Sequence, residues 1–180
     1  MPVRNLIVVF GDQLDLSSSA FDGFDQKRDM VWMAEVAHES THVWTHKQRI
    51  TIFLAAMRHF RDALQERGDR VHYTQLDDAK QTDRLSQRLA IDLRSLRPEQ
   101  VIACRPGEWR VQQGLKKVCK ENEVPLDIRE DRHFYTTPED FAAHAEGRKS
   151  LRMEFFYREL RKRFDVLMDK NGKPAGGDWN

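Results

Sequence analysis

A short histidine-rich segment is the first candidate for chemistry, because residues 38–42 read HESTH and His46 follows four residues later. The spacing matches H-E-x-x-H, in which two histidines on one helix face bind zinc and the glutamate acts as a general base. Here these residues would be His38, Glu39 and His42. The segment directly follows an apolar run and contains poor helix formers, and His46 is too close to be the usual distal ligand. We therefore expect ordinary histidines in a loop or at the start of a helix, with a zinc hydrolase as a remote alternative.

A second polar segment, Gly11-Asp12-Gln13, follows the apolar run at residues 4–10, and residues 35–41 follow another such run. Glycine lets the backbone approach a ligand closely, while the aspartate and glutamine side chains offer hydrogen-bond acceptors and donors. In an open parallel sheet, ligands bind outside the carboxyl ends of the strands. These segments therefore predict a binding site at that edge. The alternative is a strand-exit turn in which Asp12 makes only a local hydrogen bond.

The elements that must position these residues alternate between strands and helices. Short apolar runs predict five strands, at residues 4–10, 30–36, 70–76, 101–104 and 126–128. Apolar residues at helical spacing predict three helices between them, at residues 47–67, 85–96 and 111–118. Such alternation builds β-α-β units with right-handed crossovers. We predict an α/β fold: a Rossmann-like, doubly wound, five-stranded parallel sheet with helices on both faces.

The alternation stops after residue 132. Two further segments have helical patterns, at residues 138–146 and 151–164. We predict three parts of the chain: an α/β domain, a helical extension and a linker, at residues 1–135, 136–168 and 169–180. Lysine and arginine are frequent at residues 148–163. This basic stretch indicates a solvated face or a surface that packs on a neighbouring domain, and the alternative is a helix that binds a phosphate backbone or a membrane.

Composition excludes several classes of protein. The 180 residues carry a net charge of +1, and 39% of them are hydrophobic, within the range of globular proteins. No apolar run approaches the roughly 18 residues needed to cross a bilayer, and no signal peptide is evident, so we expect a soluble, cytoplasmic protein. Cys104 and Cys119 make neither a disulfide framework nor a four-cysteine metal site. The glycine-rich phosphate-binding motifs of dinucleotide- and nucleotide-binding proteins are absent from the sequence.

Seven short segments, spread from the first strand to the end of the chain, carry a family resemblance. They read GDQL at 11–14, EV at 35–36, MRHF at 57–60, PGEWR at 106–110, GRKSL at 147–151, MEFFYRE at 153–159 and GGDWN at 176–180. In this order they resemble the bacterial deoxyribodipyrimidine photolyase-related proteins, the iron–sulfur cryptochrome and (6-4) photolyase group. The resemblance covers essentially the whole chain.

The resemblance implies a fold and a role. Members of that family have an N-terminal α/β antenna domain followed by an all-helical domain that binds FAD and a [4Fe-4S] cluster. The chain looks like the antenna domain, so we expect a longer protein in which a domain beyond residue 180 is its partner. We expect neither FAD nor the cluster, nor DNA repair, in this chain alone. The longer protein would act on damaged DNA or in light signalling.

The resemblance also implies an antenna chromophore, 6,7-dimethyl-8-ribityllumazine, at the carboxyl edge of the sheet. The matching positions for its binding are Gly11, Asp12, Gln13, Glu35, Glu39, Thr41, Phe53 and Met57. On this interpretation Glu39 forms a hydrogen bond with the polar edge of the lumazine, and Phe53 packs on its ring. The alternative is a free-standing α/β protein that binds a small molecule or nucleotide without photochemistry.

Overall fold

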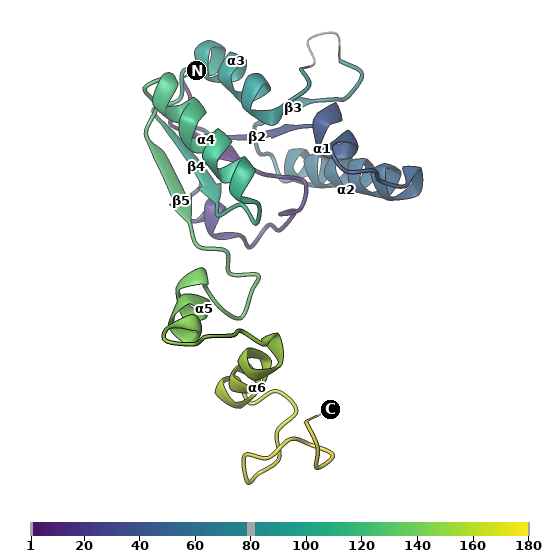
Figure 1. The fold of residues 1–180 in the computed structure, drawn as a ribbon. Coiled ribbons are helices and arrows are strands. Elements are labelled where there is room, and N and C mark those ends of the chain that lie inside the picture. The colour runs from purple at the N-terminus through teal and green to yellow at the C-terminus, as the bar shows by residue number, and fades with distance from the viewer. Residues whose placement is uncertain (1, 79–81, 180) are drawn as a thin grey trace. The chain divides into compact units, whose positions relative to one another are not determined.

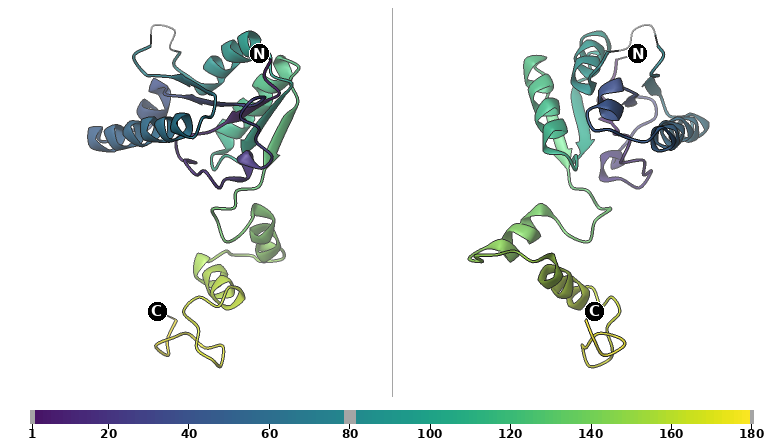
Figure 2. Two further views of the ribbon diagram at one scale, coloured as in Figure 1. Left: turned by 180° about the vertical axis from the view of Figure 1, so that it is seen from behind. Right: turned by 45° about the vertical axis from the view of Figure 1, so that its right-hand side comes forward.

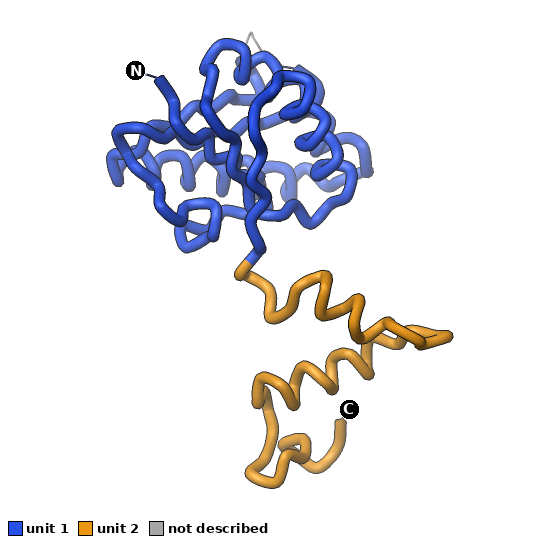
Figure 3. The backbone as a smooth tube through the Cα atoms, turned by 90° about the vertical axis from the view of Figure 1, so that its left-hand side faces the viewer, with its two compact units in different colours: residues 1–131 blue, residues 132–180 orange. Residues whose placement is uncertain are grey.

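A computed structural model describes residues 2–78 and 82–179. Asn180, the last residue of the GGDWN segment, lies outside the described residues. The chain forms two compact units, Met1–Asp131 and Arg132–Asn180 (Figure 3). The predicted three-part division of the chain stays a prediction.

The first unit is built on a five-stranded, all-parallel sheet. Its strands are β1 (Asn5–Val8), β2 (Met30–Ala34), β3 (Val71–Thr74), β4 (Gln100–Cys104) and β5 (Leu126–Arg129). They lie in the order β3-β2-β1-β4-β5, so the connections change side at β1 (Figure 1). Ile7 of β1 lies opposite Val31 on one side and Ile102 on the other. The predicted Rossmann-like, doubly wound sheet is confirmed.

Helices cover both faces of this sheet. The helical elements of the unit are η1 (Ser19–Phe21), α1 (Ala37–Thr41), α2 (Lys47–Glu66), α3 (Leu85–Leu96) and α4 (Trp109–Glu121). Successive side chains of a strand point to opposite faces, so Leu6 and Val8 pack with α3 and α4, while Ile7 packs with α2. Figure 2 shows α3 and α4 together on one side of the sheet and α2 on the other. The central strands are nearly fully buried because both faces are covered.

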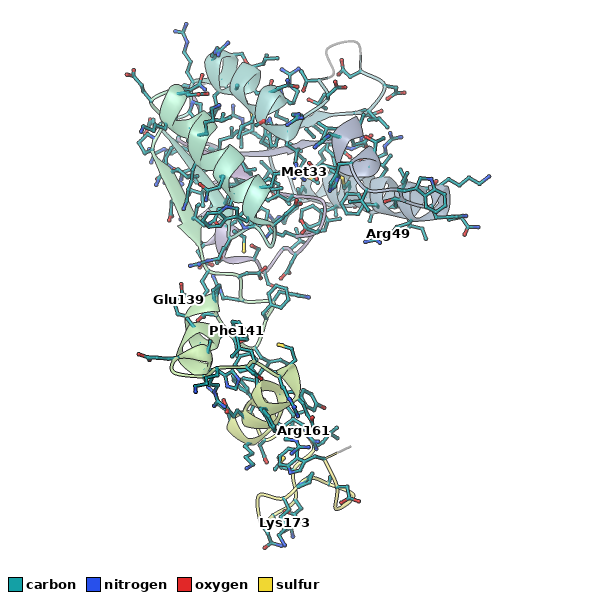
Figure 4. All side chains as sticks on the ribbon, viewed as in Figure 1. Met33, Arg49, Glu139, Phe141, Arg161 and Lys173 are labelled. Atoms are coloured by element: carbon teal, nitrogen blue, oxygen red, sulfur yellow. The ribbon has the colours of Figure 1, made fainter. Side chains whose placement is uncertain are left out.

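The second unit contains α5 (Pro138–Ala145) and α6 (Met153–Arg163). A capping box begins α5: the Thr137 hydroxyl accepts a hydrogen bond from the Asp140 amide, and the Asp140 carboxylate accepts one from the Thr137 amide. The ring of Phe141, seen between the two helices in Figure 4, packs edge-to-face on Phe156 with centroids 5.2 Å apart. Of the helices that the structure describes, none is long and apolar enough to cross a membrane.

Candidate ligand-binding site

A cavity of about 270 Å³ lies where three strands of the first unit end. Its walls come from the exits of β1, β2 and β4, from α1, from the first half of α2 and from the starts of α3 and α4. The lining residues are Phe10, Gly11, Asp12, Ala34, Glu35, Val36, Glu39, Ser40, Arg49, Phe53, Leu54, Met57, Leu85, Pro106, Gly107, Glu108 and Val111. This is the edge at which open parallel sheets bind ligands, and the volume is near the lower end of the roughly 300–1,000 Å³ of small-molecule sites.

The structure brings most of the residues predicted from the sequence together in this cavity. Six of the eight line it: Gly11, Asp12, Glu35, Glu39, Phe53 and Met57. Gln13 and Thr41 are not among its lining residues. The Thr41 hydroxyl is exposed and donates to the Ala37 carbonyl at 2.9 Å, within its own helix.

Gln13 lies behind the strand exit. Its side-chain amide nitrogen donates to the Arg105 carbonyl at 2.8 Å, which ties the exit of β1 to that of β4. Its amide oxygen is buried and has no hydrogen-bond partner among the described residues. Gln13 therefore holds the exits of β1 and β4 together, and its Oε1 atom remains available as an acceptor.

The apolar wall of the cavity depends on a glycine. A Cβ atom added at Gly11 would lie 2.5 Å from Cζ of Phe53 and 2.8 Å from Sδ of Met57. Both distances are far below van der Waals contact, so the backbone at Gly11 can lie against α2 only without a side chain. Phe53 itself is still 38% exposed. Its ring is thus packed on the strand exit and accessible at the cavity.

Glu35 forms the rigid part of the polar wall. Its buried carboxylate accepts hydrogen bonds from Arg58 at 2.7 and 2.8 Å, from the Tyr73 hydroxyl at 2.7 Å and from the Leu76 amide at 2.8 Å. Burial by itself would raise the pKa of Glu35, but these hydrogen bonds outweigh burial and hold the pKa below its usual value. Glu35 thus joins β2 to α2 and β3 as an ionised group. Its contacts suit a framework residue rather than a flexible ligand contact.

A guanidinium links two other carboxylates of the wall. Arg110 donates to Glu39 at 3.0 and 3.1 Å and to Glu108 at 2.8 and 3.0 Å. Hydrogen bonding to Arg110 lowers the pKa of Glu108. The pKa of Asp12 is instead raised, mainly by desolvation of the carboxyl and also by the charges of Asp131, Glu39 and Glu108. The wall therefore offers mostly acceptor atoms to a ligand.

The chain matches one protein family over nearly all of its length. The family "Deoxyribodipyrimidine photo-lyase-related protein" matches residues 7–180. The chain belongs to this photolyase-related family. A curated relative, the (6-4) photolyase of Agrobacterium fabrum (strain C58 / ATCC 33970), is 40% identical over 179 residues. The matched region is 99% of this chain and 35% of that relative, so the chain spans about a third of the relative's length.

In this photolyase-related chain, the histidines of the H-E-x-x-H segment make local contacts. The helix that carries them, α1, has only five residues. Nδ1 of His42 lies 2.9 Å from the His38 carbonyl, and Nδ1 of His46 accepts from the Gln48 amide as the N-cap of α2. Glu39, the supposed general base, is bound to Arg110. Over residues 2–78 and 82–179, no cluster of three metal-ligating side chains is present.

Sequence reasoning missed the contribution of the third strand exit to this photolyase-related site. Pro106, Gly107 and Glu108 follow β4 and line the cavity, and Arg110 holds Glu39 from behind. These residues stand in the PGEWR segment, which was noted only as part of a resemblance. The signal was present, because the rule that ligands bind at strand carboxyl ends applies to β4 as well as to β1 and β2.

Proposed function

We propose that this chain is the antenna-chromophore domain of a photolyase-related flavoprotein. In that role it harvests light for flavin-driven repair of DNA photoproducts or for light signalling. The observation that carries the proposal is the cavity at the carboxyl edge of the sheet, with an aromatic ring on one side and carboxylate acceptors on the other. Membership of the photolyase-related family supports the same role.

The residues of the cavity fit 6,7-dimethyl-8-ribityllumazine. Phe53 and Met57 offer an aromatic and a thioether surface for a flat bicyclic ring, and Gly11 lets the backbone approach it. Asp12, Glu39 and Glu108 offer acceptors for ring N–H and ribityl hydroxyl groups. When bound, the chromophore would supply absorption of near-ultraviolet or blue light and transfer of excitation without bond making.

The chain's own residues would hold and orient this group. Glu35, fixed by Arg58 and Tyr73, keeps β2 and α2 at a constant separation, so that Phe53 faces the exit of β1. The side chains of Val36, Leu54 and Leu85 add apolar surface to the cavity lining. Rigid placement of a chromophore is what efficient excitation transfer requires.

We assign FAD, the [4Fe-4S] cluster and contact with damaged DNA to a longer protein. Cluster ligands are cysteine thiolates. Burial raises the pKa of the Cys119 thiol to about 11, and both cysteines are buried in the first unit. This environment disfavours thiolates, which supports placing the cluster in a partner domain.

The test is a titration of the purified chain with 6,7-dimethyl-8-ribityllumazine, followed by the fluorescence of the ligand. We expect saturable binding of one ligand per chain, and about tenfold weaker binding by Glu39→Gln, the cost of one hydrogen bond to a charged group. Glu121→Gln, an exposed residue at the end of α4, is the matched control and should bind like the wild type. A folded chain that binds no lumazine would refute the proposal, and nucleotide binding by that chain would favour the free-standing binding protein.

A further inference from the structure

Arg110 is placed behind the wall of the cavity rather than in it. The two carboxylates that it binds, Glu39 and Glu108, both line the main cavity, whereas Arg110 does not. Arg110 lines a smaller neighbouring cavity of about 140 Å³, and Glu39 borders both. A ligand in the main cavity would therefore meet the carboxylates first. Arg110 can act on such a ligand only through them.

The geometry of this cluster uses both edges of the guanidinium. Nη1 and Nη2 donate to the two Glu39 oxygens at 3.1 and 3.0 Å, while Nε and Nη2 donate to Glu108 at 2.8 and 3.0 Å. Exposed single ion pairs contribute little to stability, but two-point pairs joined in a network are the exception. One arginine thus connects α1 with the start of α4, across 71 positions of the sequence.

The segment that carries Glu39 has little else to hold it. Helix α1 has five residues, far fewer than an isolated helix needs, and its N-cap residue, Val36, makes no side-chain cap. None of its residues is buried. Besides the pair with Arg110, its connection to the rest of the first unit includes a hydrogen bond from the His38 amide to the Asp83 carbonyl. The location of the Glu39 carboxylate therefore depends on Arg110.

We propose that Arg110 is a positioning residue that fixes α1 and presents the Glu39 carboxylate to the cavity as an acceptor for a donor group of the ligand. The ligand part rests on the proposed function. Arg110 and the two carboxylates together carry a net negative charge, so they disfavour an anionic ligand edge and accept from an N–H or O–H donor. Arg110 does not touch the ligand.

The test compares Arg110→Gln, Glu39→Gln and the double variant in the lumazine titration, with Arg94→Gln as control. Arg94 is an exposed arginine on α3 that donates to Asn122 and takes no part in the site. We expect roughly tenfold weaker binding for Arg110→Gln and for Glu39→Gln. The double variant should lose less affinity than the product of the two single losses, because Arg110 acts in part through Glu39. Arg110→Lys, which keeps the charge but cannot form the two-point pairs of a guanidinium, should recover only part of the loss.

Hydrogen exchange of the α1 amides in the ligand-free chain gives a second readout. We expect faster exchange in residues 37–41 of Arg110→Gln and unchanged exchange in the strands. If the wild type binds no lumazine, the proposed function fails, and the exchange rates alone decide the positioning role. Unchanged α1 exchange in Arg110→Gln overturns that role. If the wild type binds lumazine, two results would also overturn the positioning role. One is an unchanged affinity of Arg110→Gln for lumazine. The other is a loss of affinity in the double variant that equals the product of the two single losses.

Discussion

Replacement of Asp92 by asparagine should destabilise the first unit strongly. The Asp92 carboxylate is 2% exposed and accepts hydrogen bonds from Trp32 Nε1 at 2.8 Å and from Arg88 at 2.9 and 2.5 Å. His72 Nε2 lies 3.2 Å away. These contacts join α3 to β2 and β3, and the exit of β2 forms part of the cavity wall. Asparagine removes the charge and turns a donor group toward the arginine.

The magnitude follows from the burial of the pair. The Arg88 side chain is only 7% exposed, so Asp92→Asn removes the charge from a buried two-point ion pair. Breaking such a buried pair costs about 3–5 kcal/mol. For a chain of this size each kcal/mol lowers the melting temperature by about 2–4 °C. We expect a decrease of roughly 6–20 °C.

The assay is urea and thermal unfolding followed by circular dichroism, with Asp62→Asn as the matched control. Asp62 also lies on a helix and pairs with an arginine, but its side chain is 49% exposed. The control should change the free energy of unfolding by less than about 1 kcal/mol, as exposed ion pairs do. A loss below 1 kcal/mol in Asp92→Asn would refute the buried-pair argument.

The effect should also depend on pH in a defined direction. Burial would raise the pKa of Asp92, but hydrogen bonds from His72, Arg88 and Trp32 outweigh it and lower the pKa to about 2. An unfolded aspartate titrates near pH 3.9. The stabilisation by Asp92 is therefore complete above about pH 5 and is lost as the pH falls through 2. The difference between wild type and variant should narrow over this acid range, and a difference that stays constant down to pH 2 would contradict the assignment.

Three further predictions concern the cavity and the second unit. In Gly11→Ala, the new methyl group would displace the Phe53 ring, so we expect at least fivefold weaker lumazine binding (an estimate of about 1 kcal/mol for overpacking); undiminished binding would show that the ring moves aside at little cost. Thr137→Ala removes the cap of α5 and should cost about 1 kcal/mol, measured as faster amide exchange in α5, with Thr136→Ala as control. Because carboxylates dominate the polar wall, riboflavin should bind more tightly than its 5′-phosphate, and the reverse order in a competition titration would contradict the proposed electrostatics.

Much of the fold was predictable from local sequence patterns. The alternation of apolar strands with helical stripes predicted the five parallel strands, because strands buried on both faces must be apolar throughout. The bounds of the strands were less accurate. The first was predicted at residues 4–10, whereas β1 ends at Val8 and the buried Val9 and Phe10 continue beyond it. An apolar run in the sequence indicates which residues are buried, and here the buried residues extend beyond the residues that pair in the sheet. The predicted strand was therefore longer than β1.

The site was predictable only in part. The exits of the first two strands identified Gly11, Asp12, Glu35 and Glu39, which meet in the cavity. The Thr41 hydroxyl donates to its own helix, and the Gln13 side chain donates to the Arg105 carbonyl at the exit of β4. Neither contact was predictable, because side-chain direction depends on local backbone geometry that residue spacing does not encode.

The sequence by itself determined the fold class and the edge of the sheet at which a site would form, because both follow from periodicity and from the connection rules of parallel strands. Only the tertiary structure decided which charges pair. Arg58 with Glu35 and Arg110 with Glu39 are indistinguishable by residue type from the other arginine and acid pairs of the chain. The two partners of such a pair are selected by distance in space, and both pairs join residues that lie more than twenty positions apart in the sequence.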